Sequence, residues 1–165
     1  MNPSVHESDA DKIQVSEEIH FFKRKGKTMV RKATIVRAAD KIIDTNYEPP
    51  LKIGRGIWSE SVDNPRLTMS RVIVPPGAKN QRHYHTNCDA GMYVIKGRLK
   101  IFLGPDPELK EGIAEEGDFI FVPKGVIHGF MNLSKTEPAE IVGAYGGVSH
   151  KKEAGTFYLE PAKEE

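Results

Sequence analysis

From residue 31 onward, short runs rich in β-branched and aromatic residues alternate with polar stretches that contain Gly, Pro, Asn and Asp. Helical periodicity is not sustained beyond a couple of turns anywhere in this part of the chain. Short runs bounded by such turn-forming residues are typical of strands, and they predict an all-β sandwich or small barrel. The ten predicted strands are residues 32–38, 56–62, 67–74, 91–97, 98–104, 112–116, 118–123, 126–132, 139–146 and 156–161.

The first 30 residues have a different character, because they mix charged and apolar residues and include the basic run KRKGK at 23–27. We interpret residues 1–30 as a charged, solvated N-terminal leader, with an arm that binds nucleic acid or a membrane as the alternative. The apolar pair Phe21 and Phe22 indicates that the leader packs on another surface, for example a neighbouring subunit. Residues 31–165 then form one domain, which suits a chain of 165 residues.

Composition excludes several classes of function. The 24 Lys and Arg residues nearly balance the 23 Asp and Glu residues, and the net charge of +1 argues against a nucleic-acid partner. The single cysteine, Cys88, forms no intrachain disulfide, which favours a reducing compartment. The N-terminus lacks the pattern of a secretory signal, and no apolar stretch approaches the ~20 residues that cross a bilayer. We therefore expect a cytoplasmic protein without a membrane partner.

Two histidines stand two residues apart in QRHYH, residues 81–85. In a strand, side chains at i and i+2 share a face, so Gln81, His83 and His85 point the same way. A third histidine, His128, follows a strand-turn-strand pattern in which Gly125 provides the unusual backbone angles of the turn. If these segments pair across a barrel, three imidazoles meet in its interior. Such a group can bind a divalent cation.

The two segments resemble the two sequence motifs of the cupin superfamily. The first motif segment, residues 77–97, matches the pattern at Gly77, His83, His85 and Gly97. The second segment, residues 117–132, matches it at Gly117, Pro123, Gly125, His128 and Asn132. The resemblance implies an all-β, single-domain cupin fold, the double-stranded β-helix or jelly-roll barrel. It also implies that His83, His85 and His128 bind a metal ion.

The first motif departs from the cupin pattern at its glutamate. With the four-residue spacing of the motif this ligand falls on Ala90, and with the three-residue spacing it falls on Asp89. Asp89 is therefore an additional candidate ligand, and its alternative is an exposed turn residue beside Asn87. Gln81 shares the strand face of the histidines and is a candidate for contact with a bound water or substrate, with a surface position as the alternative.

Three neutral imidazoles leave a divalent cation with its full charge, which favours an anionic, bidentate small-molecule substrate such as an enolate or a hydroxy- or keto-carboxylate. With Fe²⁺, the favoured metal, the resemblance implies a three-histidine non-heme iron dioxygenase. With Zn²⁺, Mn²⁺ or Ni²⁺, isomerase, lyase or decarboxylase chemistry is the alternative, and a non-catalytic small-molecule-binding cupin is another. The sequence identifies no catalytic residue beyond the metal ligands and no further cofactor. We expect a homodimer built through the leader and the segment 156–161.

Overall fold

The computed structural model describes residues 22–24, 27–29, 33–63, 65–105 and 107–159. It divides the chain into two units, Met1–Ala33 and Thr34–Glu165. In the first unit, β1 (Phe22–Arg24) and β2 (Lys27–Met29) pair as an antiparallel hairpin. Most of the predicted leader, including Phe21, lies outside the described residues.

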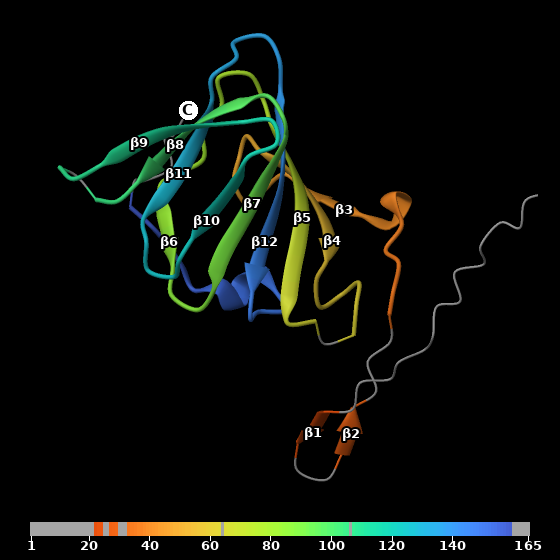
Figure 1. The fold of residues 1–165 in the computed structure, drawn as a ribbon. Coiled ribbons are helices and arrows are strands. Elements are labelled where there is room, and N and C mark those ends of the chain that lie inside the picture. The colour runs from red at the N-terminus through yellow and green to blue at the C-terminus, as the bar shows by residue number, and fades with distance from the viewer. Residues whose placement is uncertain (1–21, 25–26, 30–32, 64, 106, 160–165) are drawn as a thin grey trace, which may run out of the picture. The chain divides into compact units, whose positions relative to one another are not determined.

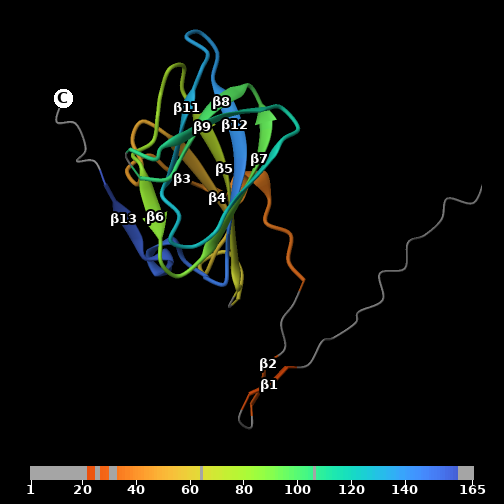
Figure 2. The same cartoon turned by 60° about the vertical axis from the view of Figure 1, so that its left-hand side comes forward.

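Within the described part of the second unit, the strands form two antiparallel sheets that face each other (Figures 1 and 2). One sheet has the order β10-β7-β12-β5-β4-β3, with β3 (Ile42–Asp44), β4 (Lys52–Ile57), β5 (Leu67–Val74), β7 (Asp89–Lys96), β10 (Phe119–Val122) and β12 (Ala139–Gly146). The other has the order β13-β6-β11-β8-β9, with β6 (His83–His85), β8 (Arg98–Leu103), β9 (Lys110–Glu115), β11 (His128–Asn132) and β13 (Thr156–Tyr158). Two short 3₁₀ helices, η1 (Ala38–Asp40) and η2 (Lys151–Ala154), complete the unit. The predicted all-β jelly roll is confirmed.

The first two predicted strands are wrong. Residues 33–37 have no regular structure and are followed by η1; Ile35 is 74% exposed, so this run has no core to join. In the second run only residues 56–57 lie in a strand, because the Ser61 hydroxyl donates to the Gly56 carbonyl and accepts from the Trp58 amide, closing a turn. In the barrel unit the sequence reveals neither β3 nor most of β4, whose two glycines and two basic residues give β4 low strand propensity.

The interior of the barrel is built in layers that follow the register of β5, β12 and β7. Ile141 pairs with Val72 and Val94, and these three side chains form an apolar layer. Four residues along β12, Tyr145 pairs with Thr68 and Ala90. Between the two layers Gly143 pairs with Ser70 and Met92. Because strand side chains alternate between faces, these small and polar residues also point inward, and they leave room for a pocket.

Gly97 marks the point where the chain passes from β7 in one sheet to β8 in the other. Its φ is +93°, and a Cβ on this residue would lie 2.9 Å from the Ala139 Cβ. Both the left-handed backbone and the close approach therefore require glycine here, as the first motif has it.

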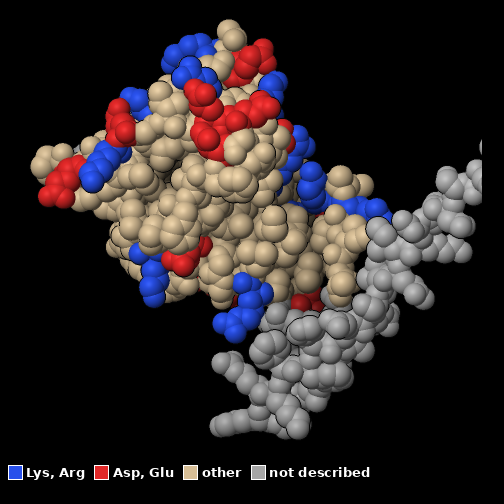
Figure 3. Space-filling model, viewed as in Figure 1, with Lys and Arg blue, Asp and Glu red and all other residues tan. Residues whose placement is uncertain are grey.

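The outer face of β7 and β10 carries exposed aromatic side chains, Tyr93, Phe119 and Phe121. The space-filling view shows that acidic and basic side chains are interspersed around the margins of this side of the molecule, with uncharged residues in the middle (Figure 3). No helix among the described residues is long and apolar enough to cross a membrane.

Candidate metal centre

The structure brings the three predicted histidines together inside the barrel. His83 in β6 pairs directly with His128 in β11, so the two motif segments are neighbours in one sheet rather than partners across the barrel. Each side chain offers one ring nitrogen to a group whose atoms all lie within 4.8 Å of one another. All three residues are buried. This arrangement allows one ion to contact all three rings.

Local hydrogen bonds set the orientation of two of the rings. His83 Nδ1 lies 2.7 Å from the carbonyl oxygen of Gln81, and His128 Nδ1 lies 3.0 Å from that of Val126. A carbonyl only accepts, so each Nδ1 carries the proton and each Nε2 keeps a free lone pair. Gln81 thus acts through its main chain, whereas the sequence pointed to its side chain. The third ring, His85, has its Nδ1 3.0 Å from the Thr156 hydroxyl of β13.

Burial keeps the three imidazoles neutral. It lowers the pKa of His85 to about 3 and that of His128 to about 4, and it holds the pKa of His83 below its usual range. His83 Nε2 and His85 Nε2 are buried side-chain atoms without a hydrogen-bond partner among the described residues. Buried polar atoms are nearly always paired, so two unpartnered ring nitrogens side by side indicate a place for a ligand, and the Nε2 lone pair of His83 favours a cation. A divalent metal ion fits this donor set.

Asp89 does not join the histidines. Its side chain is exposed, and its Oδ1 accepts a hydrogen bond of 2.9 Å from the Lys124 amide. The next residue, Ala90, points the other way and lines the pocket. Successive strand residues face opposite sides, so only one of the two could reach the interior. Cys88 is buried nearby, and burial raises the pKa of its thiol to about 11, which keeps it protonated at neutral pH.

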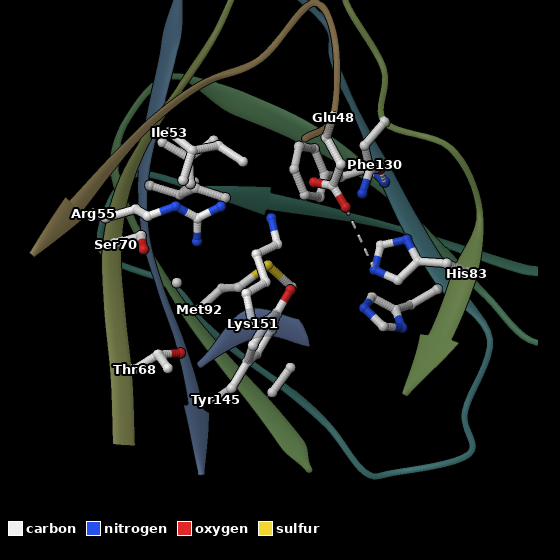
Figure 4. Close-up of a pocket in the computed structure, with 16 residues that line it drawn as sticks. Glu48, Ile53, Arg55, Thr68, Ser70, His83, Met92, Phe130, Tyr145 and Lys151 are labelled. Carbon is white, nitrogen blue, oxygen red and sulfur yellow. Dashed lines mark hydrogen bonds and ion pairs between the residues drawn. The ribbon is translucent and has the colours of Figure 1, made fainter. Parts of the chain in front are cut away.

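A charged wall faces the pocket as well, and the sequence did not reveal it (Figure 4). Glu48 precedes β4, Arg55 lies in β4 and Lys151 begins η2. Arg55 forms an ion pair with Asp44, and Lys151 lies over the ring of Tyr47. Burial lowers the pKa of Lys151 to about 8 and raises that of Glu48 above its usual range. No local motif marks these residues, because they lie outside both histidine segments.

Apolar and aromatic side chains complete the pocket. Met92 and Phe130 line it, whereas Val94 is fully buried in the core. The ring centroids of Tyr145 and His85 lie 4.6 Å apart. Burial raises the pKa of Tyr145 well above its usual range. The tyrosine therefore stays protonated at neutral pH. The site combines neutral metal-ligating groups, a few buried charges and a water-poor surface.

Comparison with known proteins agrees with this geometry. Residues 70–145 match the family model described as the cupin domain. Just under half of the chain is therefore similar to the cupin domain, and this part holds all three histidines. Curated relatives include a germin-like protein of subfamily 3 from Arabidopsis thaliana, 31% identical over 78 residues, and an oxalate oxidase from Triticum aestivum, 29% identical over 80 residues. These matches cover 47% and 46% of this chain and only 34% and 36% of the two relatives.

Solved cupin structures share the fold. An oxalate oxidase structure has a TM-score of 0.57 at 20% identity, covering 70% of this chain and 58% of that one. The polyketide cyclase RemF from Streptomyces resistomycificus has a TM-score of 0.63 at 16% identity, with 80% and 89% covered. At these identities the likeness concerns the barrel alone, since one fold hosts many activities.

Proposed function

We propose that this protein is a metal-dependent cupin enzyme, a three-histidine non-heme iron dioxygenase that acts on a small, anionic, chelating substrate. The observation that carries the proposal is the convergence of three neutral histidines, two of which, His83 and His128, line a pocket that also holds Lys151 and Arg55. Neutral ligands do not cancel the charge of a metal ion. Together with two buried cations they favour an anion.

The chain's own residues would hold the metal and orient the substrate. His83 and His128 are fixed by main-chain carbonyls, so their Nε2 lone pairs stay directed into the pocket. When bound, Fe²⁺ would supply Lewis acidity and a place for dioxygen, whereas Zn²⁺, which has no redox chemistry, would supply Lewis acidity alone. The apolar side of the pocket, with Phe130 and Ile141, would exclude water from the reacting substrate.

Lys151 is the residue best suited to bind the anion. It is only 7% exposed and reaches into the pocket from the start of η2 (Figure 4). Arg55 is already paired with Asp44, whereas Lys151 rests on an aromatic ring, a weaker partner than a carboxylate. A carboxylate or enolate that binds the metal at one end would meet this ammonium group at the other. The oxalate oxidase relative makes a short dicarboxylate a sensible first substrate to test.

Metal content and oxygen consumption test the proposal together. We expect near-stoichiometric iron in the purified protein and its loss in the His83→Ala, His128→Ala double variant. Oxygen uptake would then be screened with oxalate, hydroxy acids, β-diketones and thiols. Turnover without oxygen uptake, whether with Zn²⁺, Mn²⁺ or Ni²⁺, would assign an isomerase, lyase or decarboxylase instead. Ligand binding without any metal would leave a non-catalytic binding cupin.

We also propose that the protein is a cytoplasmic homodimer whose partner is a small molecule, with no nucleic acid and no membrane. The exposed aromatic residues Phe157 and Tyr158 of β13 support an interface at this sheet edge. A light-scattering mass of one chain would contradict the dimer.

A further inference from the structure

Glu48 is a buried carboxylate for which the described structure offers no hydrogen-bond partner at one oxygen. Its side chain is 9% exposed, and Oε1 belongs with His83 Nε2 and His85 Nε2 to the unpartnered buried atoms. All three residues lie in the barrel unit, and the carboxylate faces His83 across the pocket (Figure 4). Burial raises the pKa of Glu48 and outweighs the charge of the buried Lys151, which lowers it, and Oε1 still has no hydrogen-bond partner among the described residues. A carboxylate buried in this way calls for a further ligand.

The neighbouring histidine does not itself satisfy Glu48. Oε1 lies 3.9 Å from His83 Nε2, which is too long for a hydrogen bond. In addition, His83 carries its proton on Nδ1, where it donates to the Gln81 carbonyl. His83 Nε2 therefore directs a lone pair at the Glu48 carboxyl group, and the ionised form of that group meets it with lone pairs of its own. A cation placed between the two atoms removes this conflict.

The separation of the two atoms suits a shared metal ion. Metal–nitrogen and metal–oxygen bonds in such sites measure about 2.0–2.2 Å, so two ligands of one ion lie at most ~4.4 Å apart. The observed 3.9 Å falls within this limit. We propose that Glu48 supplies the carboxylate ligand that the first cupin motif lacks at Ala90. The inference rests on the proposed metal centre and adds a fourth protein ligand to it.

Local contacts hold Glu48 in place from a segment outside both motifs. The Glu48 carbonyl accepts from the Leu51 amide at 2.8 Å, and Leu51 is buried in the core. Just before it, Asp44 Oδ1 accepts from the amides of Asn46 and Tyr47. Ala90, the position that the motif gives to glutamate, lines the same pocket with only a methyl group. A small residue at this position leaves space for the carboxylate of Glu48, which lies in the connection between β3 and β4.

A carboxylate ligand also changes the charge of the site. Glu48 would reduce the net charge of a bound divalent ion and its ligands from +2 to +1. The buried ammonium of Lys151 would then supply the second positive charge at a distance from the metal. This separation favours a substrate with two anionic groups over one with a single anionic group, because each group meets its own positive partner.

Co²⁺ binding to metal-stripped protein tests the inference without any activity assay. We would titrate Co²⁺ and follow both calorimetry and the visible absorption of the ion, which reports on its ligands. The Glu48→Gln variant is expected to bind Co²⁺ at least about 100-fold more weakly, because the loss of a ligand should exceed the 10–100-fold effect of outer contacts. Its absorption spectrum is expected to change. Adding Ala90→Glu to this variant is expected to restore part of the affinity.

The matched control is Glu60→Gln. Glu60 Oε1 also lies 3.9 Å from a histidine nitrogen, Nε2 of His150. Its side chain is 61% exposed, however, and it does not line the pocket. Its Co²⁺ affinity and spectrum are expected to match those of the wild type. Thermal melting checks folding: a cooperative transition of metal-free Glu48→Gln shows that the variant still folds.

Two results would overturn the inference, and they have different meanings. If the His83→Ala, His128→Ala variant loses Co²⁺ while Glu48→Gln keeps wild-type affinity and spectrum, the metal centre stands and Glu48 is not its ligand. If the double-histidine variant binds Co²⁺ as well as the wild type does, the metal centre itself fails and Glu48 has no metal to bind.

Discussion

The pocket has two walls that are built in different ways. The histidine wall consists of His83, His85 and His128, which come from two strands paired in one sheet. Two of its rings are oriented by carbonyls only two residues away in the chain. The charged wall consists of Glu48, Arg55 and Lys151, which come from a loop, a strand of the other sheet and a 3₁₀ helix.

The difference lies in what holds each wall in place. The histidine wall uses the regular backbone of β6 and β11, so the same motif produces the same geometry wherever it folds into a barrel. The charged wall depends on contacts between distant segments, such as Arg55 with Asp44 and Lys151 with Tyr47. The first wall therefore explains why the protein can bind a metal. The second is particular to this chain and is the place where substrate choice would be decided.

Removing a histidine should have the largest effect. His85→Ala is expected to weaken metal affinity by more than about 100-fold, because a ligand is lost and its place is taken by a methyl group. The affinity would be measured by calorimetry on metal-stripped protein. His150→Ala removes a histidine outside the cluster and serves as the control. Equal affinity of the two variants would mean that the histidine wall does not bind the metal.

The histidine wall was also the part that could be predicted. Spacing alone put His83 and His85 on one strand face, and the match of the second motif added His128 and the buried Asn132. Asn132 indeed joins separate segments, since its Nδ2 donates to carbonyls of Val74, Pro75 and Glu137. The motif encodes these contacts because they are local or follow from strand pairing.

Glu48 and Lys151 could not be predicted, because their roles depend on how distant segments pack. Lys151 stands in a charged stretch, HKKE, that looks like any solvated surface run, yet it is buried while its neighbour Lys152 is exposed. Because most of β4 is not predicted from the sequence, the positions of Arg55 and Glu48 beside the pocket are not predicted either. Without that strand, nothing in the sequence places residues 48–55 beside the histidines.

The charged wall can be tested separately from metal binding. Lys151→Met is expected to weaken the binding of a small dicarboxylate such as oxalate by about 10- to 100-fold, the cost of one charge-assisted hydrogen bond. Metal affinity should change by less than about threefold, because the ammonium is not a ligand. Isothermal titration of the metal-loaded protein gives both numbers. Lys152→Met is the matched control. A loss of metal affinity as large as the loss of anion affinity would contradict the separation of the two walls.

A smaller effect is expected where β13 supports the histidine wall. Thr156→Val removes the hydroxyl that lies 3.0 Å from His85 Nδ1 while keeping the shape of the side chain. Loss of such an outer contact typically costs about tenfold in metal affinity. Thr86→Val, a similar change at an exposed threonine, should have no effect on the metal. If Thr156→Val leaves the affinity at the wild-type value, His85 is oriented by the backbone alone.

The smallest expected effect is a pH dependence that belongs to the charged wall only. Burial lowers the pKa of Lys151 to about 8, so its ammonium is charged below that pH and neutral above it. The affinity for a dicarboxylate should therefore be full near pH 7 and fall by at most about tenfold as the pH rises through 8 to 9. Hydroxide also competes for a metal at high pH, so the comparison with Lys151→Met is essential. That variant should lack the step near pH 8, because it has no ammonium to lose. If both proteins show the same step, it arises at the metal, and the charge of Lys151 plays no part in binding the anion.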